Sequence, residues 1–162
     1  AVAAWNDEHT VLKRGLSLTP VKFGISFTAN HLNQAGALVH VYTDGSIHLN
    51  HGGTEMGQGL NIQVAQVVAH EFQVPLEAVK ISATRTDKVP NTSSTAASSG
   101  SDLNGMAAQA AARTIKQRLV AFAAEAFGCK PAEVLFAPDG VTAGKTKLSF
   151  TELVRRAYFA RI

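Results

Sequence analysis

The eight residues from Gly52 to Gly59 (Gly-Gly-Thr-Glu-Met-Gly-Gln-Gly, here the glycine loop) are the part of this chain best suited to binding chemistry. Glycine lets the main chain approach a ligand closely, although each one costs about 0.5–1 kcal/mol relative to alanine in a regular element. The loop joins a predicted strand to a predicted helix, and a helix start directs N–H groups toward negative charge. It matches neither the P-loop nor the dinucleotide fingerprint. The residues alone therefore leave two interpretations open, an anion or cofactor site and a tight packing turn.

A second stretch, residues 91–101 (here the serine loop), also leads into a predicted helix and is rich in hydroxyl groups. Ser99 or Ser101 can serve as an N-cap, which accounts for one serine but not for the others. Ala96 and Ala97 are small enough to leave room for a bulky ligand. Two such helix starts in one small chain predict a shared anionic ligand.

The remaining candidate residues indicate no catalytic group and no metal site. A two-residue turn at Asp44-Gly45 would pair His40 with Leu49, which places His40 and His48 on opposite faces of a hairpin. The other histidines lack the spacing of metal ligands. We interpret Glu55 as structural or solvent-exposed rather than as a general base, and Cys129 has no activating neighbour.

Hydrophobic periodicity and turn signals predict an α+β fold, a mixed sheet with hairpins and about four helices. We expect a first helix with Val2, Trp5 and Leu12 on one face and Gly15 as its C-cap, and a strand from Leu16 to Phe27. The other expected elements are a hairpin of 37–42 and 46–51, helices over 60–74 and 102–127, a strand over 79–84, a hairpin around 138–140, and a last helix with a capping box at 149–152.

Composition limits the classes of function. The 162 residues fit one domain, and a net charge of +3 is too small to indicate nucleic acid or an anionic membrane as partner. A single cysteine and the lack of a signal-like or membrane-spanning stretch predict a cytoplasmic location. Charged residues make up 17%, below the usual value of about 25%. This indicates either a surface covered by other parts of a longer protein or an alanine-rich monomer, and the two chain ends favour a fragment.

Several ordered motifs resemble the molybdenum-binding portion of xanthine dehydrogenase. They are the segments 22–28 (Lys-Phe-Gly-Ile-Ser-Phe-Thr), 33–37 (Asn-Gln-Ala-Gly-Ala), the glycine loop, and 89–105 from Val-Pro-Asn to Asn-Gly. The resemblance covers most of residues 10–120, and the serine loop is more similar to xanthine dehydrogenases than to aldehyde oxidases.

The resemblance implies that the ligand is molybdopterin carrying molybdenum. By it, Met56, Gly57, Gln58 and Gly59 contact the pterin and its tail. Four residues of the serine loop, Ala97, Ser98, Ser99 and Gly100, line the approach to the metal and the cofactor phosphate. Phe27 and Thr28, with Ala96 and Ala97, form the purine side of the site. The family oxidises hypoxanthine and xanthine by hydroxylation, and the cofactor carries the difficult chemistry.

The departures from the family are equally informative. Its catalytic glutamate lies beyond residue 162, so no residue here is assigned as the base, and no residue is assigned as a metal ligand. The 2Fe-2S clusters, FAD and NAD of the parent enzyme are not bound by this chain. We therefore expect an inactive fragment whose partners are the rest of the large subunit, the iron–sulfur and flavin parts, and the purine. Its exposed apolar surface predicts a homo-oligomer. The alternatives are a non-catalytic phosphate- or nucleotide-binding module and a structural, self-associating fragment.

Overall fold

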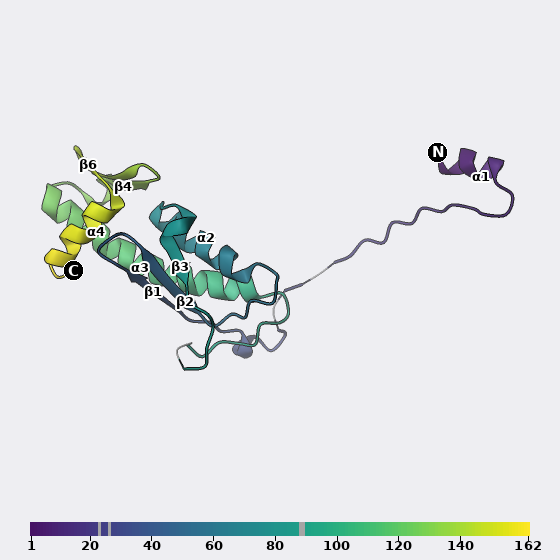
Figure 1. Cartoon of the computed structure of the whole chain (residues 1–162), viewed down its shortest axis with the longest axis horizontal. Helices are drawn as coiled ribbons and strands as arrows, with labels where there is room; N and C mark the ends of the chain where they lie inside the picture. Colours follow the sequence, from purple (N-terminus) through teal and green to yellow (C-terminus); the bar gives the residue numbers. More distant parts are fainter. Residues whose placement is uncertain (23, 26, 88–89) are drawn as a thin grey trace.

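The computed structural model describes residues 1–22, 24, 25, 27–87 and 90–162 (Figure 1). Four residues lie outside the described residues: Phe23, Ser26, Lys88 and Val89. Phe23 and Ser26 belong to the predicted N-terminal strand and to the family resemblance. Val89 belongs to the resemblance, and Lys88 precedes it. The α-helices and strands are α1 Val2–Glu8, β1 Ala37–Val41, β2 Ile47–His51, α2 Leu60–Phe72, β3 Val79–Ile81, α3 Gly100–Phe127, β4 Val134–Ala137, β5 Gly140–Ala143, β6 Thr146–Leu148 and α4 Phe150–Phe159. The predicted α+β class is confirmed.

One hydrophobic core joins the first sheet to α2 and the N-terminal half of α3. The sheet has the order β1-β2-β3, with β1 antiparallel and β3 parallel to β2. Ile47 and Leu49 of β2 are buried against the α2 face that carries Val64, Val68 and Phe72. The helix ends where Gln73 takes a left-handed conformation, two residues before Pro75. Because α2 and α3 share this core, the loops that precede them are brought to the same end of the sheet.

A second core lies at the other end of α3, where α4 and the antiparallel sheet β4-β5-β6 pack on it. Half of the predicted capping box is present, since Ser149 Oγ accepts a hydrogen bond from the Glu152 N–H at 3.1 Å. The Glu152 carboxylate pairs instead with Arg156 Nε at 2.8 Å. The predicted helix end at residue 127 is also confirmed, and Gly128 forms its C-cap with φ of 64°. Ile115 and Phe150 contact both cores, so the long helix α3 connects the two ends of the molecule.

The register of the first hairpin differs from the prediction. His40 is directly opposite His48, and Val41 is opposite Ile47, so the two histidines share one face of the sheet. The turn is longer than two residues because the Tyr42 N–H donates to the Ser46 carbonyl and the Gly45 N–H donates to the Tyr42 carbonyl. Asp44 also accepts from the Ser46 N–H, which stabilises the wider turn. Among the described residues, no group of three or more His, Cys, Asp or Glu side chains is placed to hold a metal ion.

The N-terminal predictions are wrong in two places. The first helix ends at Glu8 instead of reaching a cap at Gly15, and the described part of 16–27 contains no strand. Figure 1 shows this segment running away from the two cores. Leu12, Leu16 and Leu18 are each more than 70% exposed, so alternating apolar residues here have no sheet to pair with and no core to enter. The predicted strand over 79–84 is also shorter and ends at Ile81. No helix in the described part of the chain is long and apolar enough to cross a membrane.

Candidate functional site

The glycine loop and the serine loop lie side by side and enclose a cavity of about 390 Å³. A hydrogen bond of 2.8 Å from the Thr54 N–H to Thr95 Oγ1 joins the two loops. One helical turn further in, the Ser101 hydroxyl donates to Gln63 Oε1, so α2 and α3 are connected at the same level. The walls are formed by Met56, Gln58, Leu60 and Gln63 on one side and by Thr95, Ala96, Ser98, Gly100 and Ser101 on the other. The two loops therefore meet at one cavity, as predicted.

The amides of the glycine loop, however, are not available to an external anion. Glu55 Oε1 accepts from the Gly57 and Gly59 N–H groups, and Oε2 accepts from the Asn61 N–H at 2.9 Å. The Met56 N–H donates to Gln58 Oε1. The prediction that these main-chain amides face the ligand is wrong for Met56, Gly57 and Gly59. A carboxylate within the loop already occupies the start of α2.

Glu55 consequently has a structural role in this conformation. Hydrogen bonds from the Asn61, Gly57 and Gly59 amides hold the pKa of its carboxyl below the usual value, because they stabilise the charged form. Gln58 completes the loop through Nε2, which donates to the Thr54 carbonyl at 3.0 Å. The loop thus has a fixed shape and presents side chains, not amides, to the cavity.

The serine loop ends in an unusual main-chain conformation at the start of α3. Ala97 and Ser98 have φ of 54° and 55°, in the left-handed region that residues other than glycine rarely adopt. Such strain concentrates at functional sites. Ser99 occupies the N-cap position, but its hydroxyl donates to the Ala96 carbonyl instead of accepting from the helix. The N-cap explanation of these serines therefore fails, and α3 starts without a side-chain cap.

Buried polar side chains support both loops from below. His51 is 1% exposed, and its Nδ1 accepts from the Gly53 N–H at 3.1 Å, which requires that this nitrogen carry no proton. Burial lowers the pKa of His51 and so favours the neutral ring. Asn104 is also buried and donates to the Gly100 carbonyl at 2.8 Å, and its Oδ1 has no hydrogen-bond partner among the described residues. A Cβ added to Gly53 would lie 2.7 Å from Asn104 Nδ2, so only glycine fits between the loops here.

Phe27 lines a second hollow of about 300 Å³, to which the serine loop also contributes. Asn33 holds it in place, since its Oδ1 accepts from the Phe27 N–H and its Nδ2 donates to the Phe27 carbonyl. Ser93 and Ser94 line this hollow, and the Ser93 N–H donates to the Gln34 carbonyl. Thr28 is exposed and lies outside the lining. The serine loop therefore contributes to both hollows, with residues 93 and 94 in this one and residues within 95–101 in the cavity between the loops.

The predicted site residues divide into two groups. Met56, Gln58, Ala96, Ser98 and Gly100 line the cavity between the loops, whereas Gly57, Gly59, Ala97 and Ser99 belong to the loops without lining it. The prediction missed Leu60, Gln63, Thr95 and Ser101. A signal for Gln63 was present, because it follows the glycine loop by one turn of helix and projects on the same side as Gly59. Nothing in the sequence pattern singles out Leu60, which reads as ordinary core.

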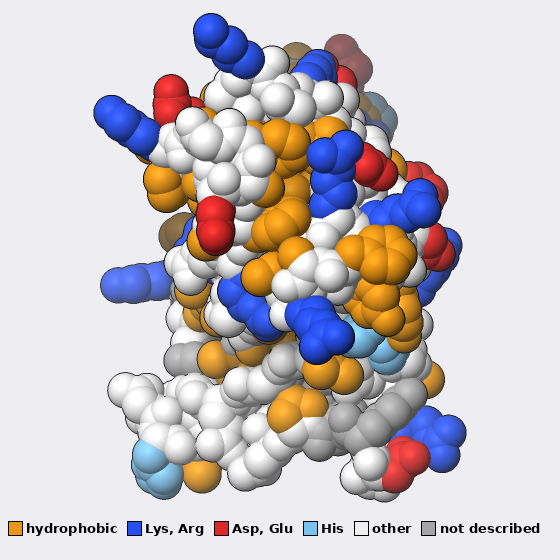
Figure 2. All heavy atoms as spheres, turned by 90° about the vertical axis from the view of Figure 1, so that its left-hand side faces the viewer, with side chains coloured by type: hydrophobic (Ala, Val, Ile, Leu, Met, Phe, Trp, Pro, Cys, Tyr) orange, Lys and Arg blue, Asp and Glu red, His pale blue; other side chains and the backbone are white. Residues whose placement is uncertain are grey.

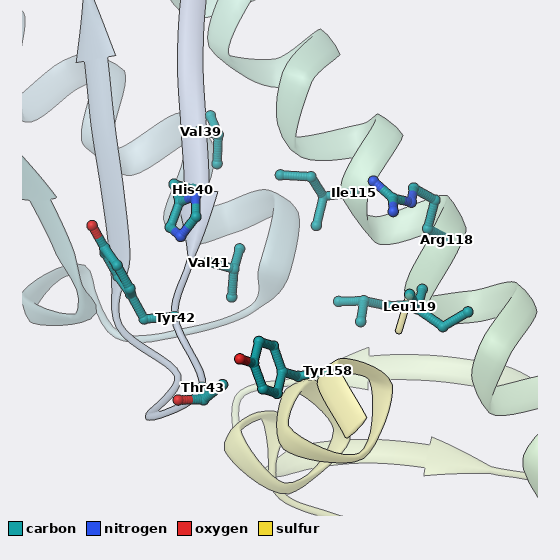
Figure 3. A pocket seen from close by; sticks show the side chains of 10 residues that line it. Val39, His40, Val41, Tyr42, Thr43, Ile115, Arg118, Leu119 and Tyr158 are labelled. Atoms are coloured by element: carbon teal, nitrogen blue, oxygen red, sulfur yellow. The ribbon is translucent and has the colours of Figure 1, made fainter. Parts of the chain in front are cut away.

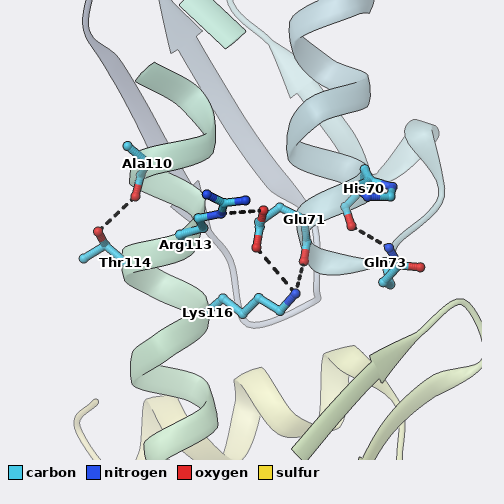
Figure 4. A network of polar contacts seen from close by, with 7 residues as sticks. All are labelled: His70, Glu71, Gln73, Ala110, Arg113, Thr114 and Lys116. Atoms are coloured by element: carbon cyan, nitrogen blue, oxygen red, sulfur yellow. Dashed lines mark hydrogen bonds and ion pairs between the residues drawn. The ribbon is translucent and has the colours of Figure 1, made fainter. Parts of the chain in front are cut away.

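A network of charged side chains joins α2 to α3, the two helices that follow the loops (Figure 4). The Glu71 carboxylate near the end of α2 lies 3.1 Å from Arg113 Nε and 3.5 Å from Lys116 Nζ of α3. Lys116 Nζ also donates to the Glu71 carbonyl at 2.6 Å. The Glu71 side chain is only 11% exposed, so this contact is stronger than an ordinary surface pair. It fixes the relative position of α2 and α3, and hence of the two loops at their starts.

Comparisons with known proteins agree with this geometry. The family model described as "Molybdopterin cofactor-binding domain" matches residues 1–162. A xanthine dehydrogenase of Dictyostelium discoideum is 60% identical over 119 residues, which are 74% of this chain and 9% of that protein. One of Calliphora vicina is 47% identical over 161 residues, covering 99% of this chain and 10% of that protein. Quinoline 2-oxidoreductase of Pseudomonas putida 86 superposes with a TM-score of 0.72 at 25% identity, over 78% of this chain and 16% of that chain. The chain spans about a tenth of the length of the curated relatives it matches.

Proposed function

Because the chain belongs to the family of molybdopterin cofactor-binding domains, we propose that the cavity between its two loops holds the molybdopterin of a xanthine dehydrogenase. The observation that carries this proposal is the direct joining of the loops, from the Thr54 N–H to Thr95 Oγ1, around one polar-edged cavity. Two helix starts that sequence places 40 residues apart thus serve one binding site.

The donor groups of the cavity fit this cofactor. Met56 is 67% exposed and free to lie on the pterin ring. The amide groups of Gln58 and Gln63 line the cavity and hydrogen-bond within the two loops, so they reach the edge of a pterin by exchanging one of these partners. The Ser98 hydroxyl, at the uncapped start of α3, suits the cofactor phosphate. Leu60 gives the cavity an apolar floor.

In the proposed enzyme the bound cofactor supplies the oxidation of the substrate carbon, and this chain supplies position. The serine loop lines both the cofactor cavity and the hollow of Phe27. We propose that Phe27 and Thr28, with Ala96 and Ala97, orient a purine beside this loop, where small side chains let it approach the cofactor. Asn33 forms two hydrogen bonds with the Phe27 main chain, so the backbone that carries the ring is held before the substrate arrives.

The wider assembly is part of the same proposal. The 162 residues act as one domain, because α3 contributes to both hydrophobic cores. We place this domain in a longer, cytoplasmic protein. The remainder of the large subunit, the 2Fe-2S clusters, FAD and NAD complete the electron path, and the catalytic glutamate belongs to that remainder. Exposed apolar residues such as Leu38, Tyr158 and Phe159 support self-association of the isolated chain.

The proposal is tested by cofactor analysis of protein produced in a host that makes molybdopterin. We expect molybdenum and oxidised-pterin fluorescence to copurify with the protein, and Gly100→Val to remove both, since its methyl groups enter the cavity beside Leu60. Gly105→Ala is the matched control in the same helix, where a Cβ would make only an ordinary contact with Val67 at 3.6 Å. Equal cofactor content in the two variants would contradict the site. The 162-residue chain alone is expected not to turn over hypoxanthine.

A further inference from the structure

Strand β1 is an edge of the first sheet, and among the described residues the main-chain groups on its free side have no strand to pair with. Within this part of the chain, β1 pairs only with β2. The Tyr42 N–H donates toward β2, to the Ser46 carbonyl. Because successive residues of a strand alternate in direction, the N–H and C=O groups of Val39 and Val41 point away from β2. Val39 is only 8% exposed, so these groups are poorly placed to be satisfied by bulk water.

The free edge opens onto a hollow of about 580 Å³ (Figure 3). Val39 and Val41 stand on one side, Ile115 and Leu119 of α3 on the other, and Tyr158 of α4 closes one end. The hollow is thus an apolar groove that runs beside a row of unpaired hydrogen-bonding groups. This combination fits an added strand, whereas a helix would leave the main-chain groups of β1 unpaired.

Charge around the groove indicates the chemistry of its occupant. Arg118 lines the groove, and no carboxylate of the described residues lies within 4 Å of its guanidinium. Residues 113–162 contain nine Lys and Arg but four Asp and Glu. Figure 2 shows this end of the molecule, where basic side chains surround apolar patches. An acidic side chain on the occupant would therefore be attracted to the groove.

We propose that β1 takes a fourth strand, an extended segment from the remainder of the longer polypeptide, in which apolar side chains alternate with an acidic one. Its main chain pairs with Val39 and Val41, its apolar side chains lie on Ile115 and Leu119, and its carboxylate meets Arg118. The matched relatives contain about nine times as much chain outside this region, and we assign the added strand to that part. A second copy fits the groove less well, because its β1 (Ala-Leu-Val-His-Val) carries no carboxylate to meet Arg118.

The test places a candidate strand next to the groove. Ile162 lines the groove, so the sequence Thr-Val-Glu-Val-Thr-Val is fused after it through a Gly-Ser linker of about six residues. The fusion gives an effective concentration of about 1 mM, which compensates for weak binding. Amide hydrogen exchange is then measured by NMR. We expect the Val39 and Val41 amides to exchange at least about tenfold more slowly than in the unfused chain.

Three controls make the result decisive. A fused strand with proline at alternate positions lacks the N–H groups for pairing and should give no protection. Arg118→Glu should reduce the protection by about fivefold, whereas Arg155→Glu, the same charge change on the exposed face of α4, should leave it unchanged. Equal exchange with and without the fused strand overturns the proposal. Protection in the unfused chain that rises with protein concentration also overturns it, in favour of a second copy. None of these measurements involves the cofactor, so this inference and the proposed function fail separately.

Discussion

Helices α2 and α3 both begin in a loop of small residues, but only one of the two starts is open to a ligand. At α2, the Glu55 carboxylate accepts from three main-chain amides and occupies the place of an external anion. At α3, the hydroxyl of Ser99 turns back to the Ala96 carbonyl, and the first turn has no side-chain cap. The positive end of the α3 dipole therefore faces the cavity between the loops.

This difference assigns separate tasks to the two loops. The glycine loop is a rigid wall that Glu55, Gln58 and His51 hold in shape, and it presents side chains to the ligand. The serine loop holds two residues in a left-handed conformation, which turns its main chain toward the open helix start. We infer that the charged part of the cofactor binds at α3 and that the planar part lies against the glycine loop.

Gly53→Val gives the largest expected effect, because it separates the two loops. A Cβ at this position lies 2.6 Å from Leu60 Cδ2 and 2.7 Å from Asn104 Nδ2, both on buried residues. We expect the free energy of unfolding to fall by about 1–3 kcal/mol, measured by urea denaturation. Gly24→Val is the control, since a Cβ there has no neighbour within 4 Å. Equal stability of the two variants would show that the loops do not need this close contact.

Ser98→Asp tests the open start of α3 directly. The aspartate adds a negative charge at the cavity, as Glu55 does at α2, and we expect molybdenum content to fall at least about tenfold. Ser98→Asn is the matched control, because it has the same size, tolerates a positive φ and carries no charge. If both variants retain the metal, the charged part of the ligand does not bind at α3.

Glu55→Gln tests the closed start of α2 through pH dependence. The pKa of Glu55 is lowered in the folded chain from the ordinary value of 4.5, so the folded state favours the charged carboxylate. Its contribution to stability is present above pH 4.5 and is lost as pH falls through the folded pKa. We expect the urea midpoint of the wild type to decline more steeply than that of Glu55→Gln between about pH 5 and pH 3. Parallel curves would mean that the carboxylate does not hold the loop in solution.

Asp102→Asn has the smallest expected effect. Asp102 is the acidic residue in the first turn of α3, and it partly offsets the positive dipole there. Its removal should raise the affinity for inorganic phosphate by about two- to threefold, measured by titration at low salt. Asp139→Asn, in the exposed turn between β4 and β5, is the control and should leave phosphate affinity unchanged. A lower affinity in Asp102→Asn would place the anion elsewhere.

Most of the elements that form the site followed from the sequence. Apolar periodicity predicted α2 and α3 to within a few residues, and Ser149 caps the start of the last helix as expected. The prediction of an N-terminal strand was wrong because alternating apolar residues form a strand only beside another strand, and Leu16 and Leu18 are exposed instead. The predicted hairpin register was wrong because Asp44 and Ser46 stabilise a wider turn.

The sequence by itself determined that two helices start in loops of small residues, because glycine and serine content is a local property of the chain. Only the tertiary structure decided which start is open. Hydrogen-bonding groups are satisfied by whichever partner comes within about 3 Å, and that distance depends on how the Glu55 carboxylate folds back on its loop. The same holds for the edge of β1, whose unpaired groups become visible only once the strand order is known.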